Sequence, residues 1–85
     1  MTEEEFYNLY NKISNVIDEY EDCHCWYCCC NEIYNGTSMS FEVYIHSDAG
    51  EGHEWVEYWV IDDYGKIYSE DDIYESYEDF LKEWI

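Results

Sequence analysis

The sequence predicts an α+β domain in which an N-terminal helix, an antiparallel sheet of three to four strands and a C-terminal helix follow one another. Apolar residues recur every three to four positions at both ends of the chain, and they alternate with polar residues in its middle. Turn signals separate the alternating segments. Each predicted helix has one apolar stripe, so both helices are expected to pack on one sheet face. At 85 residues the chain is expected to form a single domain, residues 1–85.

The first helix is predicted over residues 3–21. Thr2 and Glu5 have the spacing of a capping box, and the acids that begin at Glu3 favour a helix N-terminus. Apolar side chains then follow at helical spacing, while the other positions are polar. The predicted apolar stripe consists of Phe6, Leu9, Tyr10, Ile13, Val16, Ile17 and Tyr20.

Strands are expected in the middle of the chain. Residues 23–34 lose the helical spacing and lead to Asn35-Gly36, a pair typical of a tight hairpin turn because both residues tolerate positive φ. Residues 38–46 and 53–61 alternate between apolar and polar side chains, and the loop at 47–52 separates them. On the first of these strands, one side is Met39, Phe41, Val43 and Ile45. Tyr58, Tyr68 and one tryptophan are expected in the core.

The end of the chain is predicted to contain a short last strand and a helix. A turn at residues 62–65 precedes the possible strand at 66–68. The start of the helix is open, because Ser69 with Asp72 and Ser76 with Asp79 are both acceptable capping pairs. Its apolar stripe is expected to be Ile73, Tyr77, Phe80, Leu81 and Trp84.

Charge is the most unusual property of the chain. It has 22 Asp and Glu against three Lys and no Arg, which gives a net charge of −19 at pH 7. This composition excludes direct binding to a nucleic-acid backbone or to anionic lipid, both of which require Lys and Arg. The chain has no apolar run near the ~20 residues of a membrane span. Its acidic N-terminus also differs from a secretion signal, so a soluble cytoplasmic protein is expected. Its like charge favours a monomer.

Five cysteines lie close together, at Cys23, Cys25, Cys28, Cys29 and Cys30. On a strand they would point to both faces, and a second ligand pair for a zinc site is missing. Reduced structural thiols are therefore expected, with no cofactor, although a metal-binding or redox role stays open. Nucleophilic catalysis would pair a cysteine with His24, His46 or His53. No local motif supports such a pair, and an enzyme is not expected.

The acids of the C-terminal half are the candidate functional residues, because they are dense there and are interspersed with aromatic residues. Aromatic side chains are typical anchors of protein interfaces, although most charge runs are solvated surface. The candidate partner-binding residues are Glu51, Glu54, Glu57, Asp62, Asp63, Glu70, Asp71, Asp72, Glu75, Trp55 and Tyr64.

The chain resembles small, acidic, phage-encoded inhibitors that imitate nucleic acid, such as anti-CRISPR and anti-restriction proteins. The resemblance rests on its length, its charge of −19, its lack of Arg and the acids at Asp62-Asp63 and 70–72. It implies binding to the basic cleft of a nuclease in a bacterial host cell, with a CRISPR effector as the leading target. The alternatives are an immunity-type protein that neutralises a basic toxin, a cysteine-based metal-binding module, and a regulatory subunit.

Overall fold

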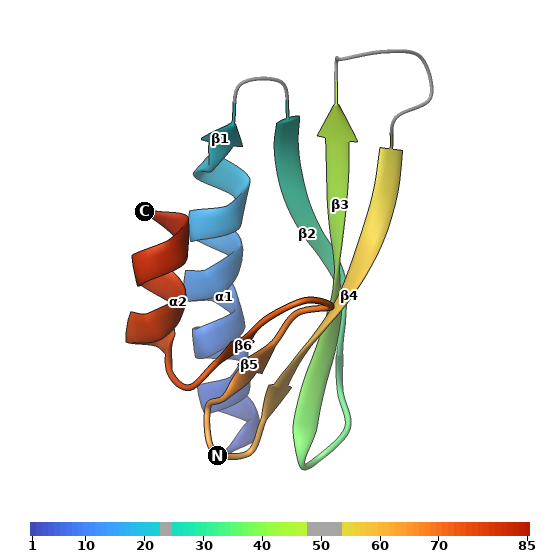
Figure 1. The fold of residues 1–85 in the computed structure, drawn as a ribbon. Helices are drawn as coiled ribbons and strands as arrows, with labels where there is room; N and C mark the ends of the chain where they lie inside the picture. Colours follow the sequence, from blue (N-terminus) through green and yellow to red (C-terminus); the bar gives the residue numbers. More distant parts are fainter. Residues whose placement is uncertain (23–24, 48–53) are drawn as a thin grey trace.

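The computed structural model describes residues 1–22, 25–47 and 54–85, and in these two helices lie on one face of an antiparallel sheet (Figure 1). The predicted α+β order is confirmed. Within the described ranges the sheet has six strands in the order β1-β2-β3-β4-β5-β6, not three to four. The sequence did not predict β1 and β6, because a two-residue strand is too short to show alternation. The elements are α1 (Glu3–Glu19), β1 (Glu21–Asp22), β2 (Cys25–Tyr34), β3 (Ser38–Ser47), β4 (Glu54–Asp62), β5 (Ile67–Tyr68), β6 (Ile73–Tyr74) and α2 (Tyr77–Trp84).

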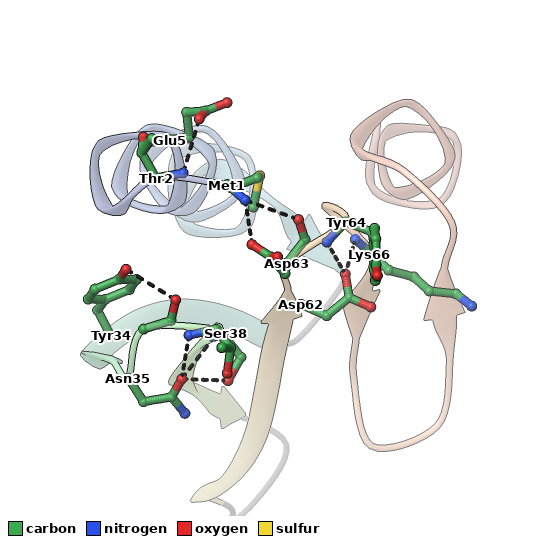
Figure 2. Close-up of polar contacts among 12 residues, drawn as sticks. Met1, Thr2, Glu5, Tyr34, Asn35, Ser38, Asp62, Asp63, Tyr64 and Lys66 are labelled. Carbon is green, nitrogen blue, oxygen red and sulfur yellow. Dashed lines mark hydrogen bonds and ion pairs between the residues drawn. The ribbon is translucent and has the colours of Figure 1, made fainter.

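Helix α1 begins with the predicted capping box (Figure 2). The Thr2 hydroxyl accepts from the Glu5 N–H at 3.2 Å, and the Glu5 carboxylate accepts from the Thr2 N–H at 3.0 Å. The helix ends at Glu19, two residues earlier than predicted, because the backbone at Tyr20 is extended. Its buried residues are Phe6, Tyr10, Ile13 and Ile17.

Removing this cap is expected to weaken the fold measurably. Thr2→Ala leaves the Glu5 N–H without its side-chain acceptor, which costs about 1 kcal/mol of unfolding free energy. Urea unfolding followed by circular dichroism measures the loss. Asn8→Ala, at an exposed position inside the same helix, is the control and should not destabilise the protein. Equal losses for the two variants would contradict a capping role.

The core lies between the helices and one face of β3 and β4. The alternation predicted for β3 is confirmed, since Met39, Phe41, Val43 and Ile45 are all buried. The sequence predicts one tryptophan in the core without identifying it, and the structure shows that it is Trp59 of β4, which is 1% exposed. Its ring lies 5.9 Å from that of Phe41 in β3, and it also contacts rings from β6 and α2. These partners are Tyr74, Phe80 and Trp84.

The C-terminal segment corrects one prediction and decides between two others. Ile73 belongs to β6 and is 60% exposed, so it is not part of the helix stripe. Helix α2 begins after Ser76, whose hydroxyl accepts from the Asp79 N–H at 3.3 Å. The other pair closes the β5–β6 turn, where the Asp72 N–H donates to the Ser69 hydroxyl at 2.9 Å.

The β2–β3 hairpin sets which residues share each sheet face. Its turn is the predicted Asn35-Gly36, with Gly36 at a φ of +98° and the Asn35 side chain accepting from Ser38 N–H at 2.9 Å (Figure 2). Strand β2 contains one extra residue between Cys30 and Ile33, and Asn31 has a φ of +55° at this bulge. The bulge shifts the pairing by one residue, so that Ile33 is on the same face as Cys28 and Cys30, and Tyr34 is on the core face opposite Met39.

Candidate functional site on the open face of the sheet

The helices cover one face of the sheet, and in the described parts of the chain nothing packs on the other (Figure 1). Residues that are paired across neighbouring strands share a face, so the register identifies the residues on this side. We call it the open face. It comprises Trp26, Cys28, Cys30, Ile33, Ser38, Ser40, Glu42, Tyr44, His46, Glu54, Val56, Tyr58, Val60, Asp62, Tyr68 and Ile73.

The open face exposes large apolar side chains. Trp26 is 49% exposed, Tyr58 is 61% exposed and Ile33 is 62% exposed. The expectation that Tyr58 lies in the core is wrong, because its register partner Glu42 is on the side that no helix covers. Tyr68 is half-buried. Exposed aromatic groups that are interspersed with carboxylates are typical of protein interfaces.

Several of the predicted acids lie on or beside the open face. Glu54 is on its outermost row, opposite His46. Glu70 reaches the free edge of β4, where its carboxylate accepts from the Tyr58 N–H at 3.3 Å. Glu75 forms an ion pair with Lys66 at 3.4 Å. Asp71 and Asp72 are exposed in the β5–β6 turn.

The Asp62 carboxylate holds the β4–β5 turn together (Figure 2). It accepts from the backbone N–H groups of Tyr64 at 2.9 Å and Lys66 at 3.0 Å, and from the Tyr68 hydroxyl at 3.0 Å. Burial alone would raise the pKa of Asp62, but these donors outweigh it and hold the pKa below its ordinary value. Asp62 therefore has a structural role in addition to its charge.

The loss of this carboxylate is expected to change stability in a pH-dependent way. Because the folded-state pKa is depressed, the stabilisation is complete above the unfolded value of about 3.9 and is lost as the pH falls through the folded value. Asp62→Asn should cost about 1–2 kcal/mol at pH 7 through its weakened hydrogen bonds. Urea unfolding measures the difference in unfolding free energy between Asp62→Asn and the native chain. This difference should be smaller at about pH 3 than at pH 7. Asp71→Asn, at an exposed neighbouring position, should show no such change.

The remaining predicted residues lie elsewhere. Trp55 pairs with Ile45 and Glu57 with Val43, which places both on the face that carries the helices. Glu57 accepts from the Trp59 indole N–H at 3.0 Å. Asp63 accepts from the Met1 amino group (Figure 2), and Tyr64 is 92% exposed in the turn. Glu51 is outside the described residues.

The few cations are engaged within the chain. Besides the pair of Lys66 with Glu75, Lys82 pairs with Asp79 at 3.5 Å and Lys12 lies 5.5 Å from the centre of the Tyr77 ring. The helices also carry exposed acids, so negative charge is present on both sides of the molecule. The open face is distinguished by its exposed aromatic and aliphatic groups and not by charge alone.

The cysteines divide between the two faces, as their alternation predicts. Cys25 and Cys29 point toward the helices, and Cys28 and Cys30 are on the open face. All four are free thiols, and burial, followed by the charge of Asp18, raises the pKa of Cys29. Within residues 1–22, 25–47 and 54–85, no group of three or more His, Cys, Asp or Glu is arranged to hold a metal ion. Cys23 lies outside these ranges.

The sequence did not identify Trp26, Glu42 or His46 as members of the site, because their shared face depends on the strand register. Comparison of the chain with known protein families, with curated proteins and with solved structures gives no match. Neither described helix is long and apolar enough to cross a membrane. A functional proposal must therefore be based on the open face and the charge.

Proposed function

We propose that this chain is an acidic inhibitor that binds the basic nucleic-acid-binding cleft of a nuclease through its open face and so blocks DNA binding. A CRISPR effector nuclease is the leading target, and the inhibitor would act as a monomer in the cytoplasm of a bacterial host. The observation that carries the proposal is an uncovered sheet face with exposed Trp26 and Tyr58, in a chain with a charge of −19.

The charge and size of the protein support competition with DNA. The molecule is 41 Å long, and duplex DNA of that length carries about 24 phosphate charges. The protein carries −19 over a similar span, and Lys66 and Lys82 already contact carboxylates. A cleft that is lined with Lys and Arg would attract it at long range, and the attraction would weaken with added salt.

The exposed apolar groups support a protein partner in preference to a purely solvated acidic surface. Trp26 and Tyr58 are the residue types that most often dominate interface energetics once they are desolvated. Two acids flank Tyr58. Glu42 is its register partner on β3, and the Glu70 carboxylate accepts a hydrogen bond from the Tyr58 N–H. This combination provides apolar anchors surrounded by charges that are complementary to a basic cleft.

A competition experiment tests the proposal. Guide-loaded CRISPR effector nucleases are screened for inhibition of DNA cleavage, and binding of the protein to each inhibited enzyme is then measured with and without target duplex. We expect the protein and the duplex to exclude each other. If the inhibited enzyme retains its duplex while the protein is bound, mimicry is wrong and an immunity-type block of catalysis replaces it. If none of the nucleases is inhibited, the choice of target is wrong.

A further inference from the structure

Three side chains from three neighbouring strands form a linked row at one end of the open face. The Cys28 sulfur lies 3.6 Å from the Nε2 atom of His46, and the Nδ1 atom of His46 lies 3.2 Å from a Glu54 carboxylate oxygen. The Trp26 ring is stacked on the imidazole, with 5.5 Å between the ring centres and 12° between the planes. The indole and the carboxylate together fix the orientation of the imidazole.

This geometry selects one form of the histidine. An ionised carboxylate can only accept a hydrogen bond, so the proton of a neutral His46 is on Nδ1, facing Glu54. The lone pair of Nε2 then faces the Cys28 thiol and can accept its proton. A thiol, an adjacent base and a group that orients the base are the components of an activated nucleophile.

Within the described residues, the two cysteines next to Cys28 in the sequence lack this arrangement. Cys30 is on the same face, but no imidazole is within hydrogen-bond distance of it among the described residues, and Cys29 is half-buried on the face that carries the helices. Desolvation, followed by the charge of Asp18, raises the pKa of Cys28, so its thiol is protonated at rest. Its reactivity therefore depends on transfer of the proton to His46.

We propose that Cys28 is a base-assisted nucleophile that forms a mixed disulfide with small, positively charged disulfides. His46 takes the thiol proton while the Cys28 sulfur attacks one sulfur of the reagent. A bond forms between these two sulfurs, and the disulfide bond of the reagent breaks. The released thiolate takes the proton from His46, so Cys28 is oxidised and half of the reagent is reduced to a free thiol.

The charge of the surroundings sets the preference for a cationic reagent. Glu42 and Glu54 are on the same face as Cys28, and the charge of Asp18 already acts on its thiol. This field repels an anionic disulfide such as glutathione disulfide and attracts a cationic one such as cystamine. The preference should decrease as salt screens the field.

The test uses the intact, isolated protein and mass spectrometry to measure the rate of mixed-disulfide formation at each cysteine. With cystamine, Cys28 should react about tenfold faster than Cys30, a modest effect for a solvent-exposed base. His46→Gln should lower the reaction rate of Cys28 to that of Cys30 and leave the rate of Cys30 unchanged. Glutathione disulfide should react more slowly than cystamine at Cys28, with a smaller difference in high salt. Equal rates at Cys28 and Cys30 in the native chain would overturn the proposal.

Glu54 acts as a positioning residue, and nitrogen NMR of the His46 ring tests this role. The native chain should show the proton on Nδ1. Glu54→Gln should increase the population of the other tautomer and lower the Cys28 rate, with an unchanged unfolding midpoint. An unchanged tautomer and an unchanged rate would remove Glu54 from the mechanism. The thiol-exchange assay contains no nuclease, so a negative result in it does not contradict the proposed function. A failure to bind nucleases likewise does not contradict the role of Cys28.

Discussion

Trp59→Ala is expected to destabilise the protein by about 3–5 kcal/mol, more than the loss of the Thr2 cap or of the Asp62 carboxylate. Trp59 is 1% exposed and its ring lies between rings of β3, β6 and α2. Its removal leaves a cavity where the sheet and the second helix meet, and it also removes the indole donor to Glu57. Because a small domain has a total stability of only about 5–15 kcal/mol, a large unfolded fraction is expected near 37 °C.

Urea unfolding followed by circular dichroism measures this loss. Trp55→Ala is the matched control, because Trp55 is in the same strand and on the same face but is 48% exposed. Trp55→Ala should lose well under half of the unfolding free energy that Trp59→Ala loses, since less apolar surface returns to water. Similar losses at the two positions would show that the core is not organised around Trp59.

Neutralising three acids on or beside the open face is expected to lower affinity for the inhibited nuclease about 100-fold, or about 2.7 kcal/mol. The variant is Glu42→Gln, Glu70→Gln and Glu75→Gln. The control removes the same charge from the helices, by Glu4→Gln, Glu19→Gln and Glu83→Gln, at exposed positions. The affinity of the control variant should fall less than about threefold. Its acids lie across the sheet from a partner on the open face, farther than the ~8 Å screening length at physiological salt.

Binding measured over a range of salt concentrations separates the two variants. The open-face variant should have a shallower dependence of affinity on salt than the native chain, because fewer carboxylates contact the cleft. The helix variant should keep the native dependence. Equal losses of affinity would mean that total charge and not the open face determines binding.

Local patterns predicted most of the fold. The capping box at Thr2, the Asn35-Gly36 turn and the alternation of β3 are each encoded within a few residues, and all three are confirmed. The strands β1 and β6 could not be predicted, because they are defined by pairing with a neighbour and not by their own two residues. Ile73 illustrates this, since its spacing matched a helix stripe while its pairing placed it in the sheet.

The site was less predictable because it depends on long-range register. The acids of the C-terminal half could be identified, but composition does not show that Asp62 bonds within its own turn or that Asp63 pairs with the distant Met1 amino group. Trp26, His46 and Glu54 come together only because three strands align across the sheet. Beyond Cys30 the bulge at Asn31 shifts the pairing of β2 with β3 by one residue, and an αL asparagine gives no clear signal in a sequence of this composition.

Hydroxyl-radical footprinting of the complex with the inhibited nuclease tests the central claim most directly. Trp26 and Tyr58 are reactive and exposed in the free protein, and both should become protected in the complex. Tyr7 and Trp84, which belong to the helices, should keep their reactivity. Protection of the helix residues, with Trp26 and Tyr58 still fully reactive, would show that the partner binds the opposite side of the molecule.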